Sequence, residues 1–308
     1  MSVLFFLLLF SFAGAFLATP RVASWARRRG FSGRDLHKPS QPEVPEQGGI
    51  AFIGVFLVAG LIYGALAEPE PWYFLTLTLA AVMACLGYAD RVRTLRAWEK
   101  LVYPALAGVP AAVYMHASGF PWYLVGLTPL LFMAACNFTN MLAGFNGLEA
   151  GTGVIAAGAL GLAAMLSGRY DAGALLLLLA SAMLGFLPHN FYPARVFPGD
   201  VGTLPVGAVL FLSAAFSGLL PALGLVLLPH AADAALKFVS AGIMTKEGQR
   251  PTLVRDGKLY PPEGGNLSLP RVLLRLAPAG ERELVVRVYA VEAALALAAV
   301  LVVLRGGF

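Results

Sequence analysis

The sequence has few charged residues. Lys, Arg, Asp and Glu make up 13% of its 308 residues, whereas a soluble globular domain typically carries about 25%. Hydrophobic residues make up 58%. This composition excludes an ordinary soluble protein, and we expect most of the molecular surface to face lipid.

Cysteine is also scarce. Cys85 and Cys136 both fall inside apolar stretches, where a thiol behaves as a small hydrophobic group. This excludes a disulfide framework and a cysteine metal site. The first apolar run has no basic residue before it and is followed by arginines from Arg21 to Arg29. We therefore expect a retained helix and not a cleaved signal peptide.

Long runs of apolar residues make up most of the sequence. A helix that crosses a membrane needs roughly 17 to 25 apolar residues. The eighth run is too long for one span, and Ser217 and Gly218 followed by Pro221 predict a turn within it. We expect an all-α integral membrane protein of about ten transmembrane helices. The runs are residues 3–17, 49–67, 72–89, 101–115, 122–136, 151–166, 172–187, 201–235 and 285–303.

The basic residues are segregated to one side of this predicted bundle. All but Arg169 and Arg305 of the 22 Lys and Arg residues fall in alternate connections. Short cytoplasmic loops are enriched in Lys and Arg, so we expect five cytoplasmic loops and both termini outside. The formal net charge of +5 then reflects topology and attraction to anionic lipid, and nothing indicates a nucleic acid partner.

The first two cytoplasmic loops contain polar residues at the membrane boundary. In the first, prolines at 39, 42 and 45 hold the chain extended, as either a stiff linker or part of a site. Asp90 ends the third span, where an acid is costly unless it faces a polar cavity or a cation. An ion pair with a neighbouring arginine is the alternative for Asp90.

The third and fourth loops are richer in such residues. Asn137, Asn140 and Asn146 follow an apolar span, and each amide needs hydrogen-bond partners once it leaves water. The oxygens of Asn140 and Asn146 suit a hard cation or a sugar, with helix capping and tight turns as the alternative. Asp200 opens a helix, where it is either an N-cap or a ligand for Mg²⁺.

The last cytoplasmic loop is the only sizeable soluble segment. It covers about residues 238–284, between helices 9 and 10 of a single membrane domain spanning residues 1–308. Asp256-Gly257 lies between two strand-like runs and predicts a hairpin, so we expect a small lid here. Lys246 and Arg250 are candidates for contacts with a diphosphate, or are solvated surface charges.

Four motifs in these loops resemble those of the polyprenyl-phosphate N-acetylhexosamine-1-phosphate transferases. The similarity is greatest to the eukaryotic and archaeal branch, UDP-GlcNAc:dolichyl-phosphate GlcNAc-1-phosphate transferase, and covers about residues 30 to 240. The motifs are Gly33-x-Asp35-x-x-Lys38 with Pro45-Glu46, Gly87-Tyr88-Ala89-Asp90, the run from Asn140 to Gly151, and the run from Tyr192 to Asp200.

The resemblance implies transfer of N-acetylhexosamine-1-phosphate from a UDP-sugar to a dolichyl or undecaprenyl phosphate at the cytoplasmic face, releasing UMP. The host membrane would be the plasma membrane of a prokaryote or the endoplasmic reticulum, and a homodimer is left open. By similarity, Asn140 and Asp200 bind Mg²⁺, with Mn²⁺ as a substitute. The implied catalytic residues are Asp90, Lys100 and Asp200, and the implied substrate-binding residues are Lys38, Glu46, Asn146, Asn190, Arg195, Lys246 and Arg250.

Two departures from the family pattern leave alternatives open. Arg91 stands where relatives usually carry a second Asp, and the last cytoplasmic loop lacks a clear His-containing motif. A non-catalytic relative is therefore one alternative. A membrane transporter is another, although transporters place polar residues near the bilayer midplane, whereas here they cluster at loop ends on one side.

Overall fold

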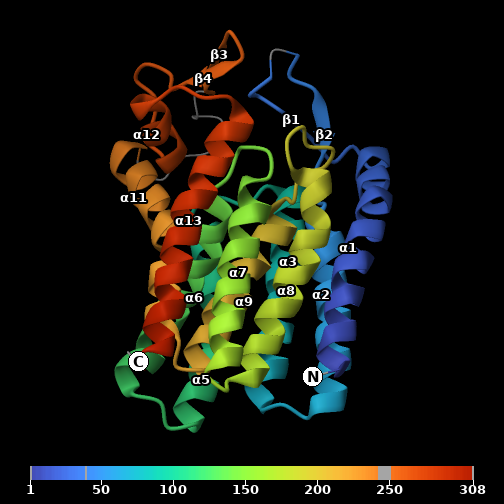
Figure 1. Ribbon diagram of the computed structural model, residues 1–308, viewed down its shortest axis with the longest axis vertical. Coiled ribbons are helices and arrows are strands. Elements are labelled where there is room, and N and C mark those ends of the chain that lie inside the picture. Colours follow the sequence, from blue (N-terminus) through green and yellow to red (C-terminus); the bar gives the residue numbers. More distant parts are fainter. Residues whose placement is uncertain (1, 39, 242–250, 307–308) are drawn as a thin grey trace.

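Long helices run side by side through most of the computed structural model, which describes residues 2–38, 40–241 and 251–306 (Figure 1). The helices are α1 (Ser2–Arg28), α2 (Gly49–Ala67), α3 (Pro71–Arg93), α4 (Glu99–Ala107), α5 (Val109–Ala117), α6 (Trp122–Met141), α7 (Leu148–Leu166), α8 (Tyr170–Asn190), α9 (Asp200–Phe216), α10 (Leu220–Val226), α11 (Leu228–Ala241), α12 (Leu269–Leu276) and α13 (Glu281–Leu304).

The lengths and compositions of these helices define an integral membrane protein. Seven described helices are long and apolar enough to cross a membrane, and the pair α10 and α11, bent by 60°, would be an eighth. Helix α9, with 17 residues, and helices α4 and α5, with nine each, are shorter. The all-α membrane architecture is confirmed in the described chain, whereas the count of ten spans stays a prediction.

Helix boundaries differ from the predicted runs in two ways. The apolar run that ends at residue 17 continues as helix to Arg28, so the arginines at 21, 27 and 28 are helical. The predicted span 101–115 is divided at Gly108, because Pro110 at the start of α5 has no N–H to continue the hydrogen bonding of α4. The predicted turn after α9 is present, with Gly218 at a φ of 71°.

Two short antiparallel hairpins interrupt the helical pattern. Strands β3 (Leu253–Arg255) and β4 (Lys258–Tyr260) flank Asp256-Gly257, whose φ angles of 49° and 72° suit a tight hairpin turn. The predicted hairpin is therefore present, while its function as a lid stays a prediction. Strands β1 (Ser32–Arg34) and β2 (Glu43–Pro45) also pair, in a segment whose prolines had predicted only an extended chain.

The two ends of the bundle differ. Figure 1 shows the N- and C-terminal ends together at one end and both hairpins, with α12, at the other. The last turns of α1 and α3 contribute Arg27, Arg28, Arg91 and Arg93 to the hairpin end. The assignment of this basic end to the cytoplasm stays a prediction.

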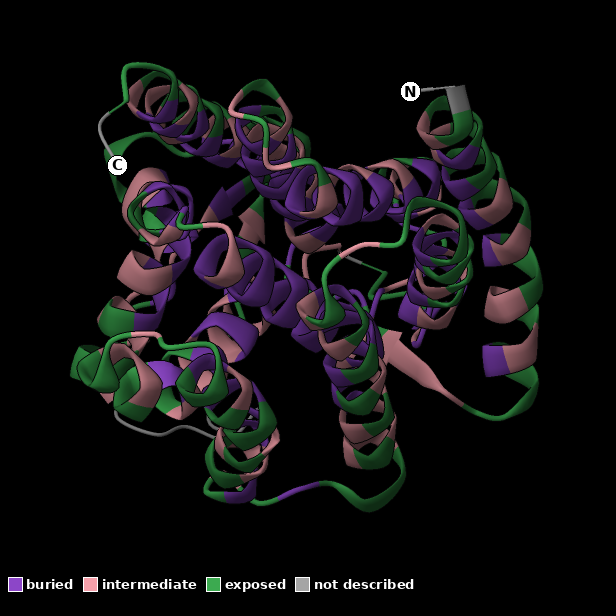
Figure 2. Ribbon diagram, turned by 90° about the horizontal axis from the view of Figure 1, so that it is seen from below, coloured by how far each residue is buried: buried purple, intermediate pink, exposed green. Residues whose placement is uncertain are grey.

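Helix α9 lies in the middle of the bundle. Every residue from Val201 to Ala215 is buried, and Figure 2 shows buried segments gathered in the interior of the bundle. Glycines allow this packing, because a Cβ on Gly87 of α3 would overlap the backbone of Asp200, and one on Gly49 of α2 would overlap Gly202. The start of α9 is thus held at backbone distance from α2 and α3.

We predict that Gly87→Ala lowers the thermal unfolding temperature of the protein in detergent. The added methyl group must displace the α9 backbone, and overpacking of this kind costs about 1 to 3 kcal/mol. Gly54→Ala in α2 is the control, because nothing lies within 4 Å of its added Cβ. Equal unfolding temperatures for the two variants would contradict the close contact between α3 and α9.

Candidate active site

Polar side chains from separate parts of the sequence line one cavity at the hairpin end of the bundle. The four that the sequence predicts as catalytic or metal-binding are Asp90 of α3, Lys100 of α4, Asn140 of α6 and Asp200 of α9. The other lining residues are Leu86, Leu95, Pro104, Asn137 and Leu204. The structure therefore brings these predicted residues together, and their chemical roles stay predictions.

Lys100 lies between the two carboxylates of this cavity. Its Nζ is 2.7 Å from Asp90 Oδ2 and 4.0 Å from Asp200 Oδ2. Asp90 Oδ1 accepts a hydrogen bond of 2.7 Å from the backbone N–H of Leu95, just beyond the end of α3. Both oxygens of Asp90 are thus engaged, which fixes the carboxylate and, through it, the ammonium group of Lys100.

Asparagines of α6 connect the cavity to its surroundings. Asn140 Oδ1 accepts a 2.7 Å hydrogen bond from the hydroxyl of Thr203, one turn into α9. Asn137 lies one turn earlier on the same face, and its Nδ2 donates to the carbonyl of Lys100 at 3.2 Å. The sequence motifs do not single out Thr203 or Asn137, although the i, i+3 spacing of Asn137 and Asn140 places both on one helix face.

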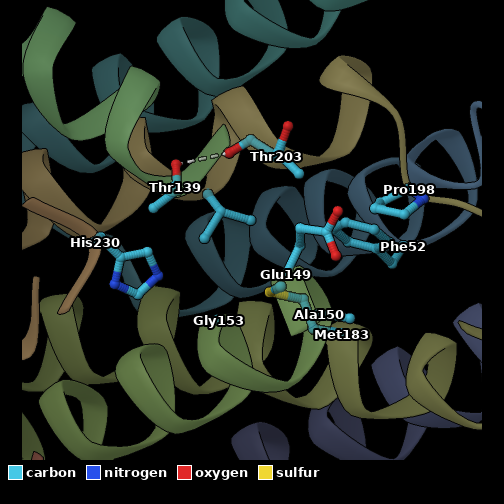
Figure 3. A pocket seen from close by; sticks show the side chains of 10 residues that line it. Phe52, Thr139, Glu149, Ala150, Gly153, Met183, Pro198, Thr203 and His230 are labelled. Carbon is cyan, nitrogen blue, oxygen red and sulfur yellow. Dashed lines mark hydrogen bonds between the residues drawn. The ribbon is translucent and has the colours of Figure 1, made fainter. Parts of the chain in front are cut away.

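A second small cavity lies next to the first. Thr203 lines it together with Thr139, which donates to the Thr203 carbonyl at 2.9 Å (Figure 3). Glu149 and His230 lie on different sides of it in Figure 3. Apolar groups complete its wall: Phe52, Ala150, Gly153, Met183, Pro198 and Val206. Thr203 therefore lines this second cavity and also hydrogen-bonds to Asn140, which lines the first.

Asn146 is the centre of a separate buried cluster. Its Oδ1 accepts from Lys38 Nζ at 2.9 Å and from the Ala194 backbone at 2.7 Å. Its Nδ2 donates to Asp35 at 3.1 Å, and its backbone N–H donates to Glu281 at 2.7 Å. The predicted substrate-binding residues Lys38 and Asn146 are therefore in contact with each other, and their amide and ammonium groups hold four segments of the chain together.

Lys38 makes two further contacts in this cluster. It forms an ion pair with Asp35, and its Nζ lies 4.9 Å from the centre of the Tyr192 ring. A cation over an aromatic face is stabilised by about 0.5 to 2 kcal/mol. The β1–β2 hairpin is thereby attached to the segment that precedes α9.

Arg91 faces away from the first cavity and toward the β1–β2 hairpin. Its guanidinium lies 3.2 Å from the Glu46 carboxylate and donates to the Ser32 carbonyl at 3.1 Å. It also lies 5.5 Å from the centre of the Phe31 ring. Glu46, predicted to bind substrate, is therefore paired with the residue that replaces the family's second Asp.

The remaining predicted substrate-binding residues lie in different surroundings. Asn190 is buried, and its Nδ2 donates to the Val196 carbonyl at 2.9 Å, closing the loop before α9. Arg195 is exposed in that loop. Lys246 and Arg250 lie outside the described residues. The structure thus places Asn190 at the end of α8 and Arg195 in the loop that follows it.

Comparison with other proteins places the chain in a family. Residues 73–218, which contain all five polar residues of the first cavity, match glycosyl transferase family 4. A Methanocaldococcus jannaschii protein named as a glycosyltransferase is 40% identical over 82% of this chain and 81% of its own. The chain therefore belongs to glycosyl transferase family 4, the family of polyprenyl-phosphate N-acetylhexosamine-1-phosphate transferases.

Relatives with more specific names support this placement. A Sulfolobus acidocaldarius protein named as a UDP-N-acetylglucosamine–dolichyl-phosphate N-acetylglucosaminephosphotransferase is 29% identical over 94% of this chain and 93% of its own. A phospho-N-acetylmuramoyl-pentapeptide-transferase of Moorella thermoacetica is 32% identical over 64% of this chain and 69% of its own. The resemblance inferred from the loop motifs is confirmed.

We predict that His37 makes the stability of the hairpin end dependent on pH. Its ring stacks on Phe145, with centroids 4.3 Å apart. Burial lowers the pKa of His37 to about 4, and the nearby Asp35 opposes this only in part. An unfolded histidine titrates near 6.5, so the stabilisation is complete above about pH 6.5 and is lost as the pH falls toward 4.

His37→Phe retains a stacking ring and removes this titration. We expect its unfolding temperature in detergent to fall less than that of the wild type between pH 7.5 and pH 5. If the unfolding temperatures of the wild type and the variant fall equally over this interval, His37 is not held neutral by the fold.

We predict that Arg91→Asp lowers the thermal stability of the protein, although it restores the residue usual in the family. The change would place an acid against Glu46 and remove the hydrogen bond to the Ser32 carbonyl, and like charges in contact are destabilising. The unfolding temperature should fall, and exchanging the pair as Arg91→Glu with Glu46→Arg should recover part of it. A wild-type unfolding temperature for Arg91→Asp would contradict a stabilising contact between Arg91 and the β1–β2 hairpin.

Proposed function

We propose that the protein transfers an N-acetylhexosamine-1-phosphate, most specifically N-acetylglucosamine-1-phosphate, from a UDP-sugar to a polyprenyl phosphate and releases UMP. This would be the first membrane step in building a glycan. The observation that carries the proposal is the single cavity that joins Asp90, Lys100, Asn140 and Asp200. These residues lie at the hairpin end of the bundle, where a soluble nucleotide and a lipid-anchored phosphate could meet.

The donor groups of the cavity fit Mg²⁺. Asn140 offers an amide oxygen and Asp200 a carboxylate, and Mg²⁺ in proteins is commonly bound by one or two carboxylates together with substrate phosphates and water. In the described parts of the chain, no three His, Cys, Asp or Glu side chains gather as a metal cluster. A site that depends on substrate oxygens for part of its ligand set agrees with this small number of protein donors.

In this reaction the protein mainly has to align the two substrates and balance their negative charge. An oxygen of the lipid phosphate would attack the β-phosphorus of the UDP-sugar, forming a new P–O bond. The bond from that phosphorus to the bridging oxygen breaks, and its electron pair leaves on UMP. A phosphate monoester has a second pKa near 6 and is largely dianionic at neutral pH, so no strong general base is required.

The residues of the cavity have distinct parts in this proposal. Lys100, held by Asp90 at 2.7 Å, would place positive charge beside the reacting phosphates. Asn140 and Asp200 would hold Mg²⁺, which when bound supplies a Lewis acid for the diphosphate. Asp90 would orient Lys100, because both of its oxygens already accept hydrogen bonds.

The proposal is tested by Asp200→Asn. The purified protein is incubated in detergent with UDP-GlcNAc, polyprenyl phosphate and Mg²⁺, and UMP is measured. We expect the variant to lose at least a hundredfold in rate, on the order expected when a key electrostatic contact is removed. Asp171→Asn, at the opposite end of the bundle, is the control and should retain wild-type turnover.

Near-wild-type turnover by Asp200→Asn would remove the metal assignment. Absence of UMP from the wild type with UDP-GlcNAc and with other UDP-N-acetylhexosamines would overturn the proposed function itself.

A further inference from the structure

A buried ion pair in α11 connects two elements that are far apart in the sequence. Asp233 and Lys237 are four residues apart on α11, and their charged groups are 2.7 Å apart. The Asp233 side chain is fully buried and that of Lys237 is 18% exposed. Neither residue lines the cavity of the proposed active site, so the pair is separate from the catalytic groups.

Lys237 reaches the end of the helix that carries Asn140. Its ammonium group donates a hydrogen bond to the carbonyl of Met141, the last residue of α6. Carbonyls in the last turn of a helix have no partner within the helix, and a cation at this end is favoured by the helix dipole. Lys237 therefore caps α6 directly beside Asn140.

Asp233 reaches the start of α12. Its Oδ1 accepts a 2.8 Å hydrogen bond from the backbone N–H of Leu269, the first residue of that helix. A second bond, from the Leu267 N–H to the Ser240 hydroxyl at 2.7 Å, attaches the preceding segment to α11. Asp233 thus fastens α12, which follows the β3–β4 hairpin, to α11.

The two contacts have the correct polarity at each end. A carboxylate accepts from the N–H groups at a helix start, and an ammonium donates to the carbonyls at a helix end. Removing one partner of a buried ion pair leaves an uncompensated charge, which is strongly destabilising. The pair therefore holds α6, α11 and α12 in one arrangement.

We infer that Asp233 and Lys237 form a clamp that positions Asn140 for the metal by joining the end of α6 to α12. Asn140 is then held from two sides, by the Thr203 hydroxyl of α9 and by the cap on Met141. Both residues act as positioning residues. This inference rests on the proposed function for the role of Asn140, whereas the clamp itself can be tested without it.

The first experiment measures hydrogen–deuterium exchange of the purified protein without substrates. We expect Lys237→Met to raise exchange in the last turn of α6, residues 138–142. Asp233→Asn should raise it in α12, residues 269–276. A roughly tenfold increase or more is expected, because hydrogen bonds to charged groups are the stronger ones. Unchanged exchange in both segments would overturn the clamp.

The second experiment measures the Mg²⁺ concentration that gives half-maximal UMP release. Lys237→Met should raise it roughly tenfold, as changes next to metal ligands commonly do, with the KM for UDP-GlcNAc little changed. Lys237→Arg should keep the Mg²⁺ requirement near that of the wild type, because the guanidinium can still donate to the Met141 carbonyl. An unchanged Mg²⁺ requirement in Lys237→Met would overturn the positioning role even if exchange rises.

A charge exchange separates the clamp from a simple ion pair. Asp233→Lys with Lys237→Asp keeps opposite charges, but lysine cannot accept from the Leu269 N–H and aspartate cannot donate to the Met141 carbonyl. We expect the exchange rates and the Mg²⁺ requirement of this variant to be raised as much as in the single variants. Wild-type values of both would contradict the two helix-end contacts.

The control is Glu283→Gln, which breaks the exposed Glu283–Arg287 pair of the same spacing on α13. It should leave exchange in both segments and the Mg²⁺ requirement unchanged. If the wild type shows no transfer, the proposed function fails, and the exchange experiment alone then decides whether the clamp exists.

Discussion

The backbone contact at the start of α9 is the constraint on which the site depends. Asp200 is the first residue of a helix whose next fifteen residues are buried. Gly87 of α3 and Gly49 of α2 allow that helix to approach without a side chain between the backbones. Because Gly87 lies one turn before Asp90 on α3, the same contact that fixes Asp200 also fixes the distance between the two carboxylates that share Lys100.

Charge balance explains how these groups are tolerated at a membrane boundary. Two carboxylates near an apolar interior are costly alone, and Lys100 compensates both. Backbone and amide contacts then fix the lysine, through Asp90 on one side and through Asn137 at the Lys100 carbonyl on the other. In the proposed reaction, a diphosphate with its cation would enter a site whose own charges are already held in place.

The position of Arg91 follows from helix geometry. Successive residues on an α-helix point about 100° apart, so Asp90 and Arg91 leave α3 in different directions. Asp90 lines the first cavity, and Arg91 instead contacts Glu46 and the carbonyls of the β1–β2 hairpin. Arg91, which stands where relatives usually carry a second Asp, therefore holds the hairpin and does not line the first cavity.

The sequence by itself determined the membrane class, most helix positions and the hairpin at Asp256-Gly257, and the resemblance of its loop motifs pointed to Asp90, Lys100, Asn140 and Asp200. Apolar length and turn chemistry are local properties, and motifs at helix ends identify which residues reach the same boundary. Only the tertiary structure decided that Glu46 pairs with Arg91, that Asn146 binds Lys38, and that Lys237 caps α6. These contacts join residues up to 108 positions apart. They depend on how α3 and α11 are rotated about their axes and on where the loops lie, which packing sets and composition does not reveal.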